Sequence, residues 1–130
     1  MTRPMTAAEL VAEARARIRE VAPTAFAADR GDAVLIDVRE PAEFETGHIP
    51  GSINIPRGVL EFQVDAHPAV ANVGDPALSR KERPIVVACR TGGRAALAAA
   101  NLQRMGFADV RSIGGGVVAW AEAGLPLVVR

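Results

Sequence analysis

The sequence predicts a single α/β domain in three layers, a mainly parallel sheet of about five strands with helices on both faces. Short apolar runs rich in β-branched residues, such as 84–88, alternate with runs of helix-forming residues, such as 94–105. The 130 residues are 49% hydrophobic, which suits one compact core. The 15 basic and 15 acidic side chains give zero formal charge, which offers no support for a nucleic acid or membrane partner.

The N-terminal residues 1–23 are expected to form a helical extension, followed by a domain over 24–130. Thr6 and Glu9 have the spacing of a capping box. A narrow apolar stripe continues along a predicted helix over 6–22, formed by Leu10, Ala14, Ile18 and Val21. A stripe of this width favours packing on the chain's own domain over a partner-binding face. Pro23 ends the helix, and a second short helix is predicted through Ala28.

Residues 33–38 are predicted to form a strand that ends beside a second strand at 84–88. Asp37 then lies at the carboxyl edge of the sheet, where parallel sheets bind ligands. Its carboxylate has two open roles: to pair with an arginine and support the neighbouring loop, or to cap the following turn. Arg39 and Glu43 are spaced for an ordinary surface ion pair.

The region from 57 to 83 is less regular. A short helix is predicted to begin at 57–62, followed by a long loop and another short helix near Leu78. Long loops often carry binding functions, so this region is a candidate for substrate choice. His67 within it and the turn residue His48, which we expect to bond to backbone, lack companions at metal-ligand spacing. The sequence therefore indicates neither a metal site nor a cofactor.

Cys89, the single cysteine, is predicted to lie at a strand-to-helix turn. Gly92 and Gly93 allow successive N–H groups to turn inward and form an anion cradle at the start of a helix. A helix N-terminus with Arg90 and Arg94 nearby favours the reactive thiolate. We therefore interpret Cys89 as a nucleophile, although a lone cysteine after an apolar strand is more often a packing residue.

The C-terminal part is predicted to finish the same sheet. Gly106 fits the position after a helix end, and residues 109–113 fit the last strand. The glycines at 114–116 lack the lysine of a phosphate-binding loop, so we expect a turn that lines the far wall of the cradle. Trp120 is expected in the core or in a pocket wall.

The run Cys89-Arg90-Thr91-Gly92-Gly93-Arg94 resembles the six-residue active-site loop of the rhodanese family of sulfurtransferases. Residues 34–44 and 47–56 resemble the two upstream signatures of that family, and 106–126 resembles its end. The resemblance covers about residues 24 to 129 and is specific, because several separate motifs occur in the expected order.

This resemblance implies that Cys89 carries sulfur as a persulfide. An anionic donor such as thiosulfate would supply it, and a thiol, cyanide or a partner protein would accept it. The resemblance and the residues together place donor binding on Arg90, Thr91, Gly92, Gly93 and Arg94, with Asp37 and Arg39 as loop support. With one cysteine the chain has no internal disulfide and no resolving thiol, which fits a cytoplasmic location and an external acceptor.

Two other functions remain open at this stage. Cysteine phosphatases and arsenate reductases also combine a cysteine, an amide cradle and an arginine, but they resemble Cys-x5-Arg, whereas four residues separate Cys89 from Arg94. No acid suited to protonate an alkoxide leaving group is evident nearby. A sulfur relay or binding module without turnover is the other alternative, although such relatives often lack the cysteine.

Overall fold

The computed structural model describes residues 3–65 and 80–129. Its five strands form one sheet in the order β1-β5-β4-β2-β3, and all four pairings are parallel. The strands are β1 (Arg19–Val21), β2 (Val34–Asp37), β3 (Ile53–Asn54), β4 (Ile85–Ala88) and β5 (Val110–Ile113). The predicted parallel α/β architecture is confirmed.

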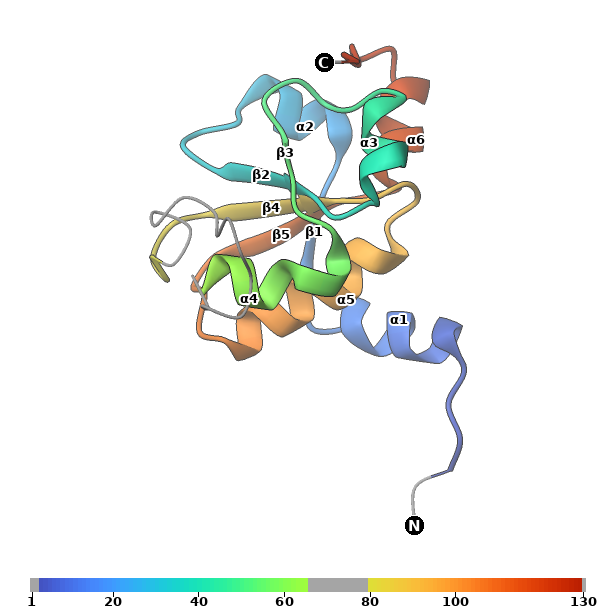
Figure 1. The fold of residues 1–130 in the computed structure, drawn as a ribbon, viewed down its shortest axis with the longest axis vertical. Coiled ribbons are helices and arrows are strands. Elements are labelled where there is room, and N and C mark those ends of the chain that lie inside the picture. Colours follow the sequence, from blue (N-terminus) through green and yellow to red (C-terminus); the bar gives the residue numbers. More distant parts are fainter. Residues whose placement is uncertain (1–2, 66–79, 130) are drawn as a thin grey trace.

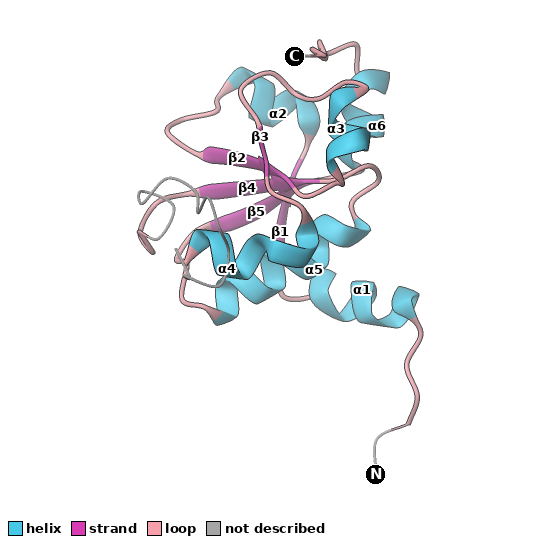
Figure 2. Cartoon of the chain, in the orientation of Figure 1, coloured by secondary structure: helices cyan, strands magenta, loops and turns pink. Residues whose placement is uncertain are grey.

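Helices cover both faces of the sheet (Figures 1 and 2). On one side lie α1 (Ala7–Arg15), the 3-10 turn η1 (Arg57–Val59), α4 (Leu60–Val64) and α5 (Gly93–Arg104). On the other side lie α2 (Pro23–Ala28), α3 (Pro41–Glu45) and α6 (Gly116–Glu122). Among the described residues, no helix combines the length and apolar character that crossing a membrane requires.

The core divides into two halves because side chains alternate across the sheet. On the α5 side, Ile36 and Val87 pack with the small residues of that helix. On the α2 and α6 side, Val86 and Ala88 pack with Phe26 and Trp120. The predicted core position of Trp120 is confirmed, and its Nε1 donates to the carbonyl of Pro126 at 2.8 Å. All residues of β4 are buried, as expected for a central parallel strand.

The N-terminal region corrects one prediction. The helix expected over 6–22 ends at Arg15, and residues 19–21 form the edge strand β1 beside β5. The apolar spacing at Ile18 and Val21 is compatible with a helix, but pairing with the open edge of β5 favours the extended backbone there. The capping box of Thr6 and Glu9 is present. Helix α1 packs on α5, so the expected packing on the chain's own domain is confirmed.

The other elements whose boundaries were predicted agree with them to within a few residues, whereas α3, β3 and α6 were not predicted individually. Pro23 is the first residue of α2 rather than the stop of α1, because its fixed φ suits a helix start. Gly106 has φ +99° at the end of α5, as predicted. The predicted long loop is only partly described, since 66–79 lies outside the described residues, and the predictions for His67 and for a short helix near Leu78 fall there.

Candidate active site

Cys89 lies directly after β4, at the carboxyl edge of the sheet where β2 and β5 also end. The Cys89 loop, residues 89–94, leads into α5, which begins at Gly93. The sulfur accepts N–H bonds from Gly92 at 3.1 Å and from Ala95 at 3.4 Å. Gly92 has φ +111°, which a side chain would strain, and this turn directs its N–H at the sulfur. Of the N–H groups predicted to form the amide cradle, that of Gly92 donates to the sulfur, and Ala95 is a second donor that was not predicted.

The glycine turn at 114–116 forms the far wall of this cradle, as predicted. Val117 N donates to the carbonyl of Cys89 at 2.9 Å, and Val118 N donates to that of Arg90 at 3.0 Å. A Cβ on Gly116 would lie 2.5 Å from both of these carbonyl oxygens, so only glycine permits the contact. The turn thus fixes the backbone of the Cys89 loop from the α6 side.

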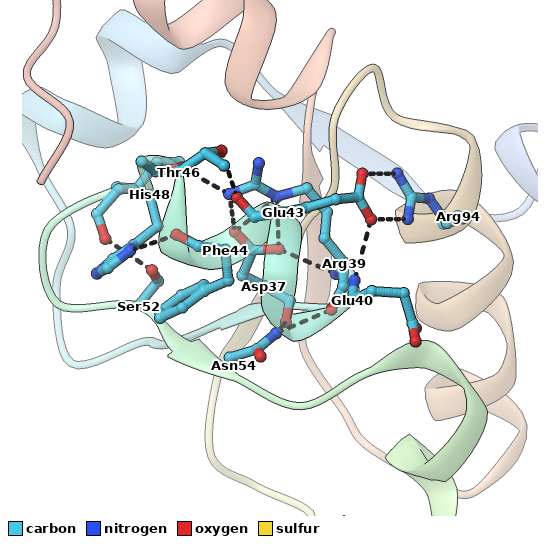
Figure 3. A network of polar contacts seen from close by, with 12 residues as sticks. Asp37, Arg39, Glu40, Glu43, Phe44, Thr46, His48, Ser52, Asn54 and Arg94 are labelled. Atoms are coloured by element: carbon cyan, nitrogen blue, oxygen red, sulfur yellow. Dashed lines mark hydrogen bonds and ion pairs between the residues drawn. The ribbon is translucent and has the colours of Figure 1, made fainter. Parts of the chain in front are cut away.

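Arg94 is bound to a carboxylate, although its side chain stays partly exposed to solvent. Its Nη1 and Nη2 donate to Glu43 on α3 at 2.7 and 2.9 Å (Figure 3). Hydrogen bonding from Arg94 is the main cause that lowers the pKa of Glu43 to about 2 from an ordinary value of 4.5. The same pairing raises the pKa of Arg94. The structure therefore gives Arg94 a supporting contact with α3, and its role toward a donor stays a prediction.

Asp37 and Arg39 form a buried pair with each other. Arg39 Nη2 donates to Asp37 Oδ2 at 2.8 Å and to the carbonyl of Gly47 at 2.8 Å (Figure 3). Asp37 Oδ1 also accepts from the Arg39 backbone N–H at 3.0 Å, so pairing with an arginine and capping of the turn occur together. The expected surface pair of Arg39 with Glu43 is wrong, because each binds a different partner. Removing one member of a buried pair typically costs about 3–5 kcal/mol.

The other predicted residues fall into two groups. Arg90 and Thr91 are exposed on the loop, and within the described part of the chain the Arg90 side chain has no hydrogen bond or ion pair. His48 is buried, its Nδ1 lies 2.9 Å from the carbonyl of Phe44, and its ring stacks on that of Phe44. The structural role expected for His48 is confirmed. Across the described residues, no three His, Cys, Asp or Glu side chains gather as a metal site requires.

Comparison with known proteins identifies the family. The family model of the rhodanese-like domain matches residues 24–123, which contain the Cys89 loop, Asp37 and Arg39. The chain belongs to the rhodanese-like domain family. The resemblance inferred from the loop motif and the two upstream signatures is thus confirmed.

Several relatives support this assignment. The chain is 35% identical over 101 residues to a sulfurtransferase of Allochromatium vinosum, covering 78% of this chain and 83% of the relative. It is 32% identical to the thiosulfate sulfurtransferase GlpE of Pseudoalteromonas translucida, covering 79% and 87%. A solved structure from Rhodopseudomonas palustris, described as a protein of unknown function and possible tyrosine phosphatase, has TM-score 0.84 and 33% identity and covers 98% of each chain.

Two features of this rhodanese-like site were missed from the sequence. Glu43 was assigned to the wrong arginine, because its partner Arg94 lies 51 residues away and no spacing rule links them. The N-terminal helix was placed outside the site, whereas Arg15 at its end approaches Gly92. The family model begins at residue 24, so the motif comparison gave no signal for that contact.

Proposed function

We propose that this protein moves sulfane sulfur from a thiosulfate-like anionic donor to a thiophilic acceptor through a persulfide on Cys89. The observation that carries the proposal is the pair of backbone N–H groups, from Gly92 and Ala95, that converge on the sulfur. Such donors at the start of the 12-residue helix α5 favour a negatively charged sulfur. The similarity to the Pseudoalteromonas thiosulfate sulfurtransferase supports this class of donor.

The reaction has two displacement steps. The Cys89 thiolate attacks the outer sulfur of thiosulfate, a new S–S bond forms, and the donor's own S–S bond breaks. Sulfite leaves with the electron pair of that bond. A thiol or cyanide then attacks the terminal sulfur of the persulfide and releases Cys89 as the thiolate. The acceptor is external, a small molecule or a partner protein, because the chain has no second cysteine.

The loop residues have separate roles in this proposal. Exposed Arg90 and Thr91 meet the donor at the mouth of the loop. The N–H groups of Gly92 and Ala95 stabilise charge on the sulfur. Arg94, held by Glu43, and Asp37, held by Arg39, keep the loop and the end of β2 in position. A cytoplasmic location, expected from the single cysteine, stays a prediction.

A turnover assay tests this function. Native protein and Cys89→Ser are incubated with thiosulfate and cyanide, and thiocyanate and sulfite are measured; p-nitrophenyl phosphate is tested in parallel. We expect thiocyanate and sulfite in equal amounts from native protein and none above background from the variant. Phosphate release that depends on Cys89, without sulfur transfer, would overturn the proposal in favour of a phosphatase, the activity suggested for the Rhodopseudomonas structure. Transfer from a protein persulfide only would favour the relay alternative.

A further inference from the structure

The last residue of α1, Arg15, reaches the turn of the Cys89 loop. A Cβ built on Gly92 would lie 3.1 Å from Arg15 Nη2, so the guanidinium lies directly against the glycine whose N–H bonds the sulfur. One turn earlier, Val11 approaches Gly93, since a Cβ there would lie 3.7 Å from the Val11 side chain. Helix α1 therefore holds a positive charge beside the loop from outside the matched region.

Arg15 differs in its pairing from Arg94 and Arg39, the two carboxylate-bound arginines near the loop. Arg94 and Arg39 each donate at least two hydrogen bonds to a carboxylate. Arg15 has a single ion pair within the described residues, from Nε to Glu20 Oε2 at 3.6 Å, which exceeds hydrogen-bond length. Its side chain is 45% exposed, and its Nη groups donate no hydrogen bond within the described part of the chain. These donors are free to meet a ligand.

We propose that Arg15 is a specificity-determining residue that attracts and orients the anionic sulfur donor at the Cys89 loop. This inference rests on the proposed function. A guanidinium at the loop mouth raises the local concentration of a dianion, and its planar donors fit the oxygens of a thiosulfonate-type group. Glu20, on β1 next to Gly114, opposes this attraction in part because its carboxylate faces Arg15.

The test compares an anionic and a neutral reagent on Cys89. Reduced native protein, Arg15→Ala, Arg15→Lys and Glu20→Gln are alkylated with iodoacetate and with iodoacetamide at low ionic strength, and the ratio of the two rates is measured. Arg17→Ala is the matched control, because Arg17 is also an exposed arginine, lies two residues after α1 and has its ion pair to Glu13. KM and kcat for thiosulfate are measured on the same proteins.

We expect Arg15→Ala to lower the iodoacetate-to-iodoacetamide ratio about fivefold, with Arg15→Lys close to native and Glu20→Gln above it. KM for thiosulfate should rise by a similar factor while kcat changes little. The differences should shrink in high salt, and Arg17→Ala should match native protein.

The two proposals fail in different ways. A ratio that is unchanged in Arg15→Ala, or lowered equally in Arg17→Ala, overturns the role of Arg15 even if thiosulfate loads Cys89. A Cys89 that neither reagent reaches in the folded protein also overturns it, since no open path then passes Arg15. If the ratio falls as expected but thiosulfate transfers no sulfur, the proposed donor is wrong and the anion-attracting role of Arg15 stands.

Discussion

The arginines around the Cys89 loop differ in how deeply their ion pairs are buried. The side chains of Arg39 and Asp37 are 6% and 1% exposed, whereas those of Arg94 and Glu43 are 39% and 36% exposed. Solvent screening weakens the second pair, and pairs of this kind typically contribute about 1 kcal/mol or less. The buried pair therefore fixes the end of β2. The exposed pair joins α3 to the loop and contributes less to stability.

Replacement of Glu43 by Gln tests how much the exposed pair of Glu43 with Arg94 contributes to stability. Because the folded-state pKa of Glu43 is lowered to about 2, its charge stabilises the fold above the ordinary value of 4.5, and this stability is lost as pH falls toward 2. We expect Glu43→Gln to lower the free energy of unfolding by about 0.5–1 kcal/mol at pH 7. The difference from native protein should shrink below pH 4.5. Urea unfolding followed by Trp120 fluorescence measures it.

The exposed Glu45 provides the control, since it lies on the same helix and has no ion pair within the described residues. Glu45→Gln should change stability by less than about 0.5 kcal/mol at either pH. A Glu43→Gln deficit that persists unchanged at low pH would show that the charge of Glu43 is not what stabilises the contact.

Replacement of Gly116 by Ala tests the close approach behind the loop. The new methyl group would lie 2.5 Å from the carbonyl oxygens of Cys89 and Arg90, so the loop backbone must move. We expect a loss of about 2–4 kcal/mol in the free energy of unfolding and slower persulfide formation. Urea unfolding and the rate of sulfur loading measure these two effects.

The Gly124→Ala variant distinguishes the effect of backbone strain from the effect of the steric clash at Gly116. Gly124 also has a positive φ, +79°, but among the described residues no atom outside its two chain neighbours lies within 4 Å of its Cβ position. Gly124→Ala should therefore lower the free energy of unfolding by about 1 kcal/mol, through backbone strain alone. The rate of sulfur loading should stay normal. Equal effects of the two substitutions would contradict the role given to Gly116.

At the scale of elements, the sequence predicted the central strands and their helices well because these carry strong local signals. The apolar run before Cys89 and the alanine-rich run after it each specify one element. Strand β1 was missed because three residues at a sheet edge acquire their conformation from pairing with β5, a contact between residues about ninety positions apart. Its local sequence continues a helical pattern.

Truncation from the N-terminus tests whether residues 24–130 fold alone, as the predicted domain boundary proposes. Removal of residues 1–5 should change stability by less than about 1 kcal/mol, because α1 and its capping box begin after them and the exposed ion pair of Arg3 with Glu9 is the contact that is lost. Removal of residues 1–23, up to the predicted boundary, also removes α1 and β1, which exposes the edge of β5 and uncovers α5. We expect a loss of more than about 2 kcal/mol, measured by urea unfolding.

If the chain that starts at residue 24 retained native stability, this expectation would be contradicted. Residues 1–23 would then be a separate N-terminal extension. The intermediate truncation, residues 1–16, removes α1 and keeps β1. It therefore separates the contribution of the helix from that of the strand.

At the scale of the whole molecule, the candidate site combines segments that only the fold brings together. The Cys89 loop, the end of β2 and the 114–116 turn meet because parallel strands all end at one edge, and this was predictable from the order of the elements. The ion-pair partners of the individual charged residues were not predictable from that order. Arg94 pairs with Glu43, and Arg39 pairs with Asp37. These pairings depend on side-chain length and burial in the folded protein, which the spacing of residues in the sequence does not give.

The mass of the intact protein shows whether Cys89 carries sulfur as a persulfide. Reduced native chain and the Cys89→Ser variant are incubated with and without thiosulfate. The intact mass of each protein is then measured by mass spectrometry before and after treatment with cyanide. We expect native protein to gain the mass of one sulfur atom, cyanide to remove that sulfur, and the serine variant to gain no mass. A native chain with a free thiol and no added sulfur would contradict the proposed persulfide chemistry with a small-molecule donor.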